Sequence, residues 1–195
     1  MIYGDEAIIK QRLAIRAAQQ NSIDNIVEIH GVEYTFARRE FDAGFTMVVP
    51  ESFEEMPIEV AKQLFLHEGR PKIIISNSDY TVIIAFNSIE LPSRIIEDRR
   101  VTYRAFMKRS LPTAVFFTQG IYDLPNEMRV AYYDYRYPII NGDMYNFTFI
   151  SDLQETELLG WFICSIDSME KWESLARQMI QTIEVSEKGV AENEQ

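Results

Sequence analysis

A run of strand-like segments between Phe45 and Ser165, followed at once by a strongly amphipathic helix, is the feature that most limits the fold. The segments are rich in β-branched and aromatic residues and are separated by short polar turns, as in antiparallel strands. The final helix lies in DSMEKWESLARQMIQTIEV, with an apolar stripe of Met169, Trp172, Leu175, Ala176, Met179, Ile180 and Ile183. The pattern predicts an α/β fold in which helices pack on an antiparallel sheet of about six or seven strands.

The expected elements can be placed along the chain. We expect helices over 5–20, 57–66, 93–110 and from Asp167 onward, a hairpin over 26–41 bent at Gly31, and strands over 44–53, 72–76, 80–86, 113–121, 128–137, 143–150 and 157–165. Asp167, with Glu170 three residues later, is expected to cap the last helix. Residues 1–25 are predicted to be an N-terminal helix and linker, 26–185 the sandwich domain, and 186–195 a disordered acidic tail.

Composition and charge limit the function. The chain has 195 residues, 47% of them hydrophobic, which is enough for one domain with a substantial core. Its formal net charge of −11 argues against a nucleic-acid partner, because neutralising phosphates requires a surplus of Lys and Arg. We find no secretory signal and no apolar run that would span a bilayer. A single cysteine, Cys164, is consistent with a reducing compartment, so we expect a cytoplasmic protein without membrane insertion.

Residues that carry chemistry are sparse. His30 and His67 lack a spaced Cys or His companion that would complete a metal site. Cys164 reads as a small buried residue, although a Cys–His pair would form if the fold brought a histidine to it. No GxGxxG, GxxxxGK[ST] or GxSxG motif occurs. The sequence therefore predicts no catalytic residue, no metal and no cofactor, and leaves open whether the protein is an enzyme.

A basic stripe stands out in this acidic chain. The segment 93–110 carries six basic and two acidic residues, a net charge of +4. Arg100, Arg104 and Lys108 recur at every fourth position, on one helix face. Tyr103, Phe106 and Met107, with Ile96, are expected on the opposite face. The stripe predicts either a solvated helix face or a docking patch for an acidic partner.

Aromatic residues alternate on two of the expected strands. Tyr133, Tyr135 and Tyr137 lie on one strand, and Tyr145, Phe147 and Phe149 lie on the next. Alternation places each set on one face of the sheet. We expect Tyr133, Tyr135, Tyr145 and Phe147 to form one patch, which either packs under a helix or lines a binding groove.

The order of the elements resembles the PsbP-like sandwich family, which includes the PsbP, Mog and DcrB types. The segment GFTMVVPESFEEMP, the helix before Pro112 and the C-terminal helix carry this resemblance over about residues 26–184. A narrower similarity, through VPESFEEMP and GRPKIIISN, is to small proteins of Firmicutes. The resemblance implies an α/β sandwich that binds other proteins, and it carries over no individual binding residue.

These observations lead to two hypotheses of function. The first is a non-enzymatic protein-binding or adaptor module, one form of which is a chaperone for a secreted or apolar segment. The second is a small-molecule-binding protein or cryptic enzyme with a pocket near the aromatic strands. A deep pocket with convergent polar groups would favour the second, and an exposed aromatic or basic surface would favour the first.

Overall fold

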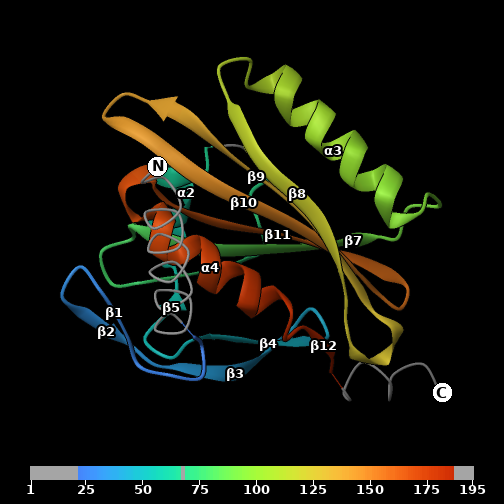
Figure 1. The fold of residues 1–195 in the computed structure, drawn as a ribbon, viewed down its shortest axis with the longest axis horizontal. Helices are drawn as coiled ribbons and strands as arrows, with labels where there is room; N and C mark the ends of the chain where they lie inside the picture. Colours follow the sequence, from blue (N-terminus) through green and yellow to red (C-terminus); the bar gives the residue numbers. More distant parts are fainter. Residues whose placement is uncertain (1–21, 67–68, 187–195) are drawn as a thin grey trace, which may run out of the picture.

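The structure, a computed structural model, describes residues 22–66 and 69–186. Its largest element is a seven-stranded antiparallel sheet with the order β5-β6-β7-β11-β10-β9-β8 (Figure 1). The strands are β5 (Glu54–Glu55), β6 (Ile73–Ser76), β7 (Val82–Glu90), β8 (Val115–Asp123), β9 (Arg129–Ile139), β10 (Gly142–Leu153) and β11 (Thr156–Ser165), with the 3-10 turn η1 (Pro125–Glu127) between β8 and β9. The antiparallel sheet predicted from the sequence is confirmed.

A smaller sheet faces the large one. It has the order β12-β4-β3 and consists of β3 (Phe36–Phe41), β4 (Phe45–Pro50) and β12 (Glu184–Val185). The strands β1 (Val27–Ile29) and β2 (Val32–Tyr34) form a separate hairpin that turns at His30 and Gly31, both with positive φ. The predicted hairpin bent at Gly31 is confirmed, but it ends at Tyr34 and not at Phe41, because β3 leaves β2 and pairs with β4 across a second turn at Gly44.

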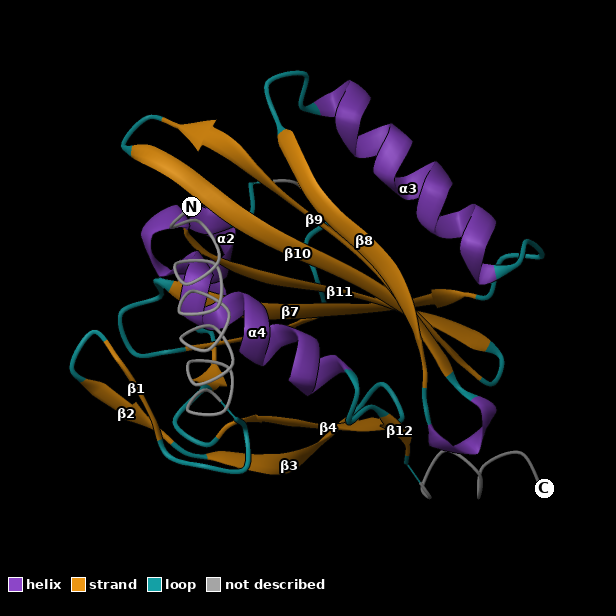
Figure 2. Cartoon of the chain, in the orientation of Figure 1, coloured by secondary structure: helices purple, strands orange, loops and turns teal. Residues whose placement is uncertain are grey.

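Helix α4 (Met169–Ile180) lies between the two sheets (Figure 2). Its predicted apolar stripe is confirmed, since Trp172, Leu175, Ala176, Met179 and Ile180 are all buried. The ring of Trp172 packs against Tyr34, Phe53 and Phe162 at centroid distances of 5.0, 6.0 and 5.4 Å. The helix thus joins the small sheet, the β1–β2 hairpin and the inner face of the large sheet into one core.

The start of α4 differs from the expected capping box. A 3-10 turn, η2 (Ile166–Ser168), precedes the helix, and the N-cap residue is Ser168, which makes no side-chain capping bond. Ser168 Oγ instead accepts a hydrogen bond from Ser165 Oγ at 3.1 Å and lies 3.2 Å from His30 Nε2. The prediction for Asp167 and Glu170 is wrong because the tighter turn moves the helix start beyond Asp167.

Two helices cover parts of the outer face of the large sheet. Ala61 of α2 (Ile58–Leu64) packs with Ile74, Ile83 and Ala85. Ile96 of α3 (Ile96–Ser110) packs with Ala131 and Ile150 on the other half of the same face. The predicted helix over 5–20 and most of the predicted tail lie outside the described residues.

Candidate functional site

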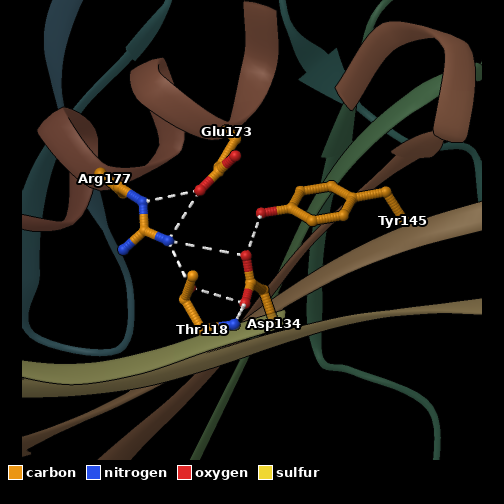
Figure 3. A network of polar contacts seen from close by, with 5 residues as sticks. All are labelled: Thr118, Asp134, Tyr145, Glu173 and Arg177. Atoms are coloured by element: carbon orange, nitrogen blue, oxygen red, sulfur yellow. Dashed lines mark hydrogen bonds and ion pairs between the residues drawn. The ribbon is translucent and has the colours of Figure 1, made fainter. Parts of the chain in front are cut away.

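A polar network lies where α4 meets the edge of the large sheet (Figure 3). Asp134 of β9 is fully buried, and its Oδ1 accepts hydrogen bonds from Thr118 N at 2.6 Å and from Thr118 Oγ1 at 2.7 Å. Its other oxygen accepts a hydrogen bond from Tyr145 Oη at 2.9 Å. Thr118 belongs to an irregular part of β8, where the pairing with β9 shifts register between Phe116 and Gln119. The Asp134 carboxylate therefore replaces the ladder bonds that the β-bulge has lost.

Arg177 of α4 completes this network from the helix side. Its Nη2 lies 3.6 Å from Asp134 Oδ2 and 2.8 Å from Glu173 Oε1, and it donates to Thr118 Oγ1 at 2.5 Å. The guanidinium also lies over the rings of Tyr132 and Phe147, at 4.5 and 5.4 Å from their centroids. Burial alone would lower the pKa of Arg177, but its contacts with Glu173 and Tyr122 raise it above the usual value. Arg177 is therefore a permanent cation that ties α4 to β8, β9 and β10.

The arrangement is suited to positioning rather than to proton transfer. Every oxygen of Asp134 already receives hydrogen bonds or an ion pair from the protein. Burial and the nearby Asp134 carboxylate raise the pKa of Tyr145, so its hydroxyl remains a donor at neutral pH. The Asp134 carboxylate therefore has no free side with which to face a substrate as a general base.

A second polar cluster fixes α3 to the sheet. The side chain of Arg99 is 3% exposed and forms ion pairs with Asp152 at 2.5 Å and with Glu157 at 2.6 Å. Glu157 also accepts a hydrogen bond from Tyr103 Oη at 2.6 Å. Burial raises the pKa of Glu157 despite the neighbouring Arg99 cation. The Arg99 and Glu157 charges are both buried, and separating them would leave each without a counter-ion. Their ion pair therefore fixes the position of α3 on the outer face.

The basic stripe is divided between two environments. Arg100 and Arg104 are half-buried, and the Arg104 guanidinium lies 4.6 Å from the centroid of the Phe116 ring on β8. Lys108 is exposed, as expected. Phe106, expected to lie with Ile96 opposite the stripe, does not share its burial, since Phe106 is 57% exposed while Ile96 and Arg99 are buried. Charge spacing alone could not tell which face of α3 the sheet covers.

The expected single aromatic patch is wrong. In the β9–β10 register, Tyr145 lies opposite Arg136 and Phe147 opposite Asp134, so Tyr133 and Tyr135 point to the other face. Tyr145 and Phe147 belong to the inner core, whereas Tyr133 and Tyr135 stack with Phe116 on the α3 side. All four rings are buried, and burial raises the pKa of Tyr133 to about 12.

The remaining candidate residues do not converge. Cys164 is a free, buried cysteine on the inner face, and burial raises the pKa of its thiol to about 12. His30 is exposed on the β1–β2 turn and approaches Ser168 rather than Cys164. His67 lies outside the described residues. Within the described ranges, no group of three or more His, Cys, Asp or Glu side chains is placed to hold a metal ion.

One cavity, of about 180 Å³, lies beside α2 and β6, away from the aromatic strands. Its lining includes Asp42, Glu55, Arg70 and Lys72. Small-molecule sites usually measure about 300–1,000 Å³. This cavity is smaller than that range and lies elsewhere, so it does not correspond to the predicted pocket near the aromatic strands.

Little in the order of residues indicates the two polar networks. Asp134 stands among alternating tyrosines, and Arg177 is a polar position between Ala176 and Met179 of the apolar stripe, so each looks like an exposed strand or helix residue. Only the pairing of β9 with β8 brings the Asp134 carboxylate to the Thr118 amide.

Among the described residues, no helix is both long and apolar enough to cross a membrane.

Comparison of the sequence with protein-family models gives no match, and comparison with curated proteins gives no significant match. Solved structures do match. Cyanobacterial PsbP (CyanoP) from Synechocystis sp. PCC 6803 has a TM-score of 0.58 and 13% identity, over 77% of this chain and 92% of that one. A mutant of the protein Mog1 has a TM-score of 0.54 and 8% identity, over 80% of this chain and 98% of that one.

Both similarities extend across the sandwich described above, with nearly the whole length of each neighbour covered. At such low identity they establish the architecture and carry no binding residue across. The seven-stranded antiparallel sheet, its helices and the smaller facing sheet show that this chain has the PsbP/Mog1-like α/β sandwich fold.

Proposed function

We propose that this protein is a non-catalytic module that binds another protein through the outward side of α3. The α3 outer surface consists of Val101, Thr102, Ala105, Phe106, Lys108 and Arg109, all of them exposed. The observation that carries the proposal is the pairing of exposed apolar groups with exposed cations on one helix. Val101 and Phe106 are 55% and 57% exposed, beside Lys108 and Arg109 in the last turn.

The charge of α3 supports an acidic partner. The helix carries five basic and two acidic residues, whereas the whole chain has a formal net charge of −11. Among the described residues, neither Lys108 nor Arg109 lies within ion-pair distance of a carboxylate. A local basic surface on an acidic protein steers oppositely charged partners and rejects similarly charged ones.

The rigidity of α3 also supports recognition. The buried Arg99 ion pairs and the bond from Tyr103 to Glu157 hold the helix in one position on the sheet. A surface that is already ordered loses less conformational entropy when a partner docks.

A chaperone for a secreted or apolar segment is a narrower form of the same proposal, supported by the exposed Val101 and Phe106. The free Cys164 thiol is compatible with a cytoplasmic setting.

Site-specific crosslinking tests this proposal. A photoreactive benzoylphenylalanine in place of Phe106, in cells of the source organism, should capture a discrete acidic protein. Lys108→Glu with Arg109→Glu should abolish that crosslink while the melting temperature stays nearly unchanged, because exposed charges contribute little to stability. The matched control is Lys62→Glu with Lys72→Glu, the same charge change on the α2 side, which should retain the crosslink. Equal capture by both double variants would refute α3 as the docking surface.

A further inference from the structure

Strand β8 forms a long free edge of the large sheet. It pairs with β9 on one side and is the last strand in the sheet order, so in the described part of the chain no strand pairs with its other side (Figure 2). A free edge presents backbone N–H and C=O groups in the spacing of a strand, which a second extended chain can pair with.

The other outer edges of the seven-stranded and three-stranded sheets are protected in the usual ways. At the opposite end of the large sheet, β5 consists of two residues, Glu54 and Glu55. In the smaller sheet, β12 is equally short, and β3 carries Arg38, Arg39 and Glu40 in its centre. Short length and charged side chains are two of the devices that prevent edge-to-edge pairing.

β8 lacks these devices. Its nine residues, VFFTQGIYD, contain no charge before the final Asp123. Val115 and Phe117 are 45% and 42% exposed, so two apolar side chains on this strand are open to a partner. An uncharged edge with exposed apolar side chains is suited to the addition of another strand.

The bulge in β8 is held in one conformation. A β-bulge normally bends an edge away from new partners. Here the Thr118 amide and hydroxyl are both bound to Asp134, and Arg177 donates to the same hydroxyl. The edge on either side of Thr118 is therefore pre-organised, which reduces the entropy lost when a strand is added.

Cations lie beside the N-terminal half of β8. The Arg104 guanidinium stacks on Phe116, and Lys108 and Arg109 are in the last turn of α3, shortly before β8 begins. None of the three forms an ion pair with a carboxylate of the described residues. Acidic side chains on an added strand would complement these charges.

We propose that β8 accepts an extended acidic segment of a partner protein as an additional strand. Its backbone pairs with the free edge, its apolar side chains contact Val115 and Phe117, and its carboxylates face Arg104 and Lys108. This inference rests on the proposed function, because it assumes a protein partner, and it adds the class of segment and the mode of binding. A second copy fits less well, since each copy has a net charge of −11.

The test uses the full chain and two synthetic nine-residue peptides that alternate valine with glutamate or valine with lysine. Binding is measured by fluorescence anisotropy, and hydrogen exchange locates the amides that become protected. We expect the glutamate peptide to protect β8 amides and to bind about tenfold more tightly than the lysine peptide, a difference of about 1.4 kcal/mol. Phe117→Glu should weaken binding of the glutamate peptide by about tenfold, and the control Ile58→Glu, at another exposed apolar residue on α2, should not.

Three results would overturn the inference: no binding of the glutamate peptide at millimolar concentration, protection away from β8, or equal binding of both peptides. Sedimentation that reveals a dimer lost in Phe117→Glu would identify a second copy as the occupant and would also overturn it. The proposed function is judged separately by the crosslink from position 106. If that crosslink forms while the peptide fails, the protein-binding role of α3 stands and strand addition at β8 falls.

Discussion

Arg99 of α3 and Glu157 of β11 form an ion pair at 2.6 Å beneath the helix, with side chains that are 3% and 0% exposed. Removing one partner of a buried ion pair destabilises the fold, because the remaining charge still lacks its hydration and no longer has a counter-ion. Replacing both partners by apolar residues of similar volume leaves no buried charge and therefore costs much less stability. The pair therefore makes the position of α3 depend on two residues that are far apart in sequence.

The first prediction concerns this pair. Arg99→Ala should lower the free energy of unfolding by about 3–5 kcal/mol, because Glu157 remains buried without its cation. Arg99→Met combined with Glu157→Leu should be much closer to the wild type. Urea denaturation monitored by circular dichroism gives both values. A single variant as stable as the wild type would mean that the pair does not hold α3.

The second prediction concerns the β8 bulge. Asp134→Asn should lower the free energy of unfolding by about 1–3 kcal/mol, because one carboxylate oxygen is replaced by an amide donor that faces other donors. The exchange of the Thr118 amide with solvent should become faster. Thr118→Val is the control, since it removes the hydroxyl but keeps the backbone bond to Asp134. If Asp134→Asn left the exchange rate at this amide unchanged, the carboxylate would not be anchoring the bulge.

The third prediction concerns Gly160 of β11. A Cβ atom at this position would overlap the ring of Phe149, whose side chain is 1% exposed and packed in the core. Gly160→Ala should lower the free energy of unfolding by about 3 kcal/mol, toward the upper end of the usual range for overpacking.

Gly69→Ala is the matched control, because no atom lies within 4 Å of the added methyl group there. It should change stability by less than about 0.5 kcal/mol. Adding Phe149→Leu to Gly160→Ala should recover part of the loss by making room for the methyl group. Strict additivity of these two changes in thermal or urea unfolding would contradict a direct clash.

The fourth prediction concerns pH. Burial raises the pKa of the Cys164 thiol to about 12, from an ordinary value near 9. Between these values the unfolded chain loses the thiol proton and the folded chain keeps it, so the contribution to stability is complete below about pH 9 and is lost as the pH rises to about 12. Cys164→Ala should therefore remove about 2 kcal/mol of the alkaline destabilisation between about pH 8 and about pH 10.5.

Urea midpoints of both proteins at the two pH values measure this difference. The folded wild type should also react with a thiol reagent only as fast as it opens, since the thiolate is the reactive form. Identical pH dependence in the two proteins, or immediate labelling of the native thiol, would show that Cys164 is accessible.

The sequence by itself determined the sheet and its closing helix. Period-two alternation in 128–137 and 143–150 identified β9 and β10, and the apolar stripe from Met169 to Ile183 identified the buried side of α4. These features are local, because each follows from the regular spacing of side chains along one element. The resemblance to PsbP-like proteins rested on the order of such elements, and the structural comparison confirms the fold.

Only the tertiary structure decided which faces meet. Alternation places Tyr133 and Tyr135 on one face of β9, but the β9–β10 register decides that Tyr145 and Phe147 lie on the opposite face of the sheet. Likewise, helical spacing groups Arg100, Arg104 and Lys108, but the buried contacts of Arg99 with Asp152 and Glu157 set the rotation of α3. The physical reason is that register and helix rotation depend on the total burial and pairing of residues distant in sequence, which no single segment encodes.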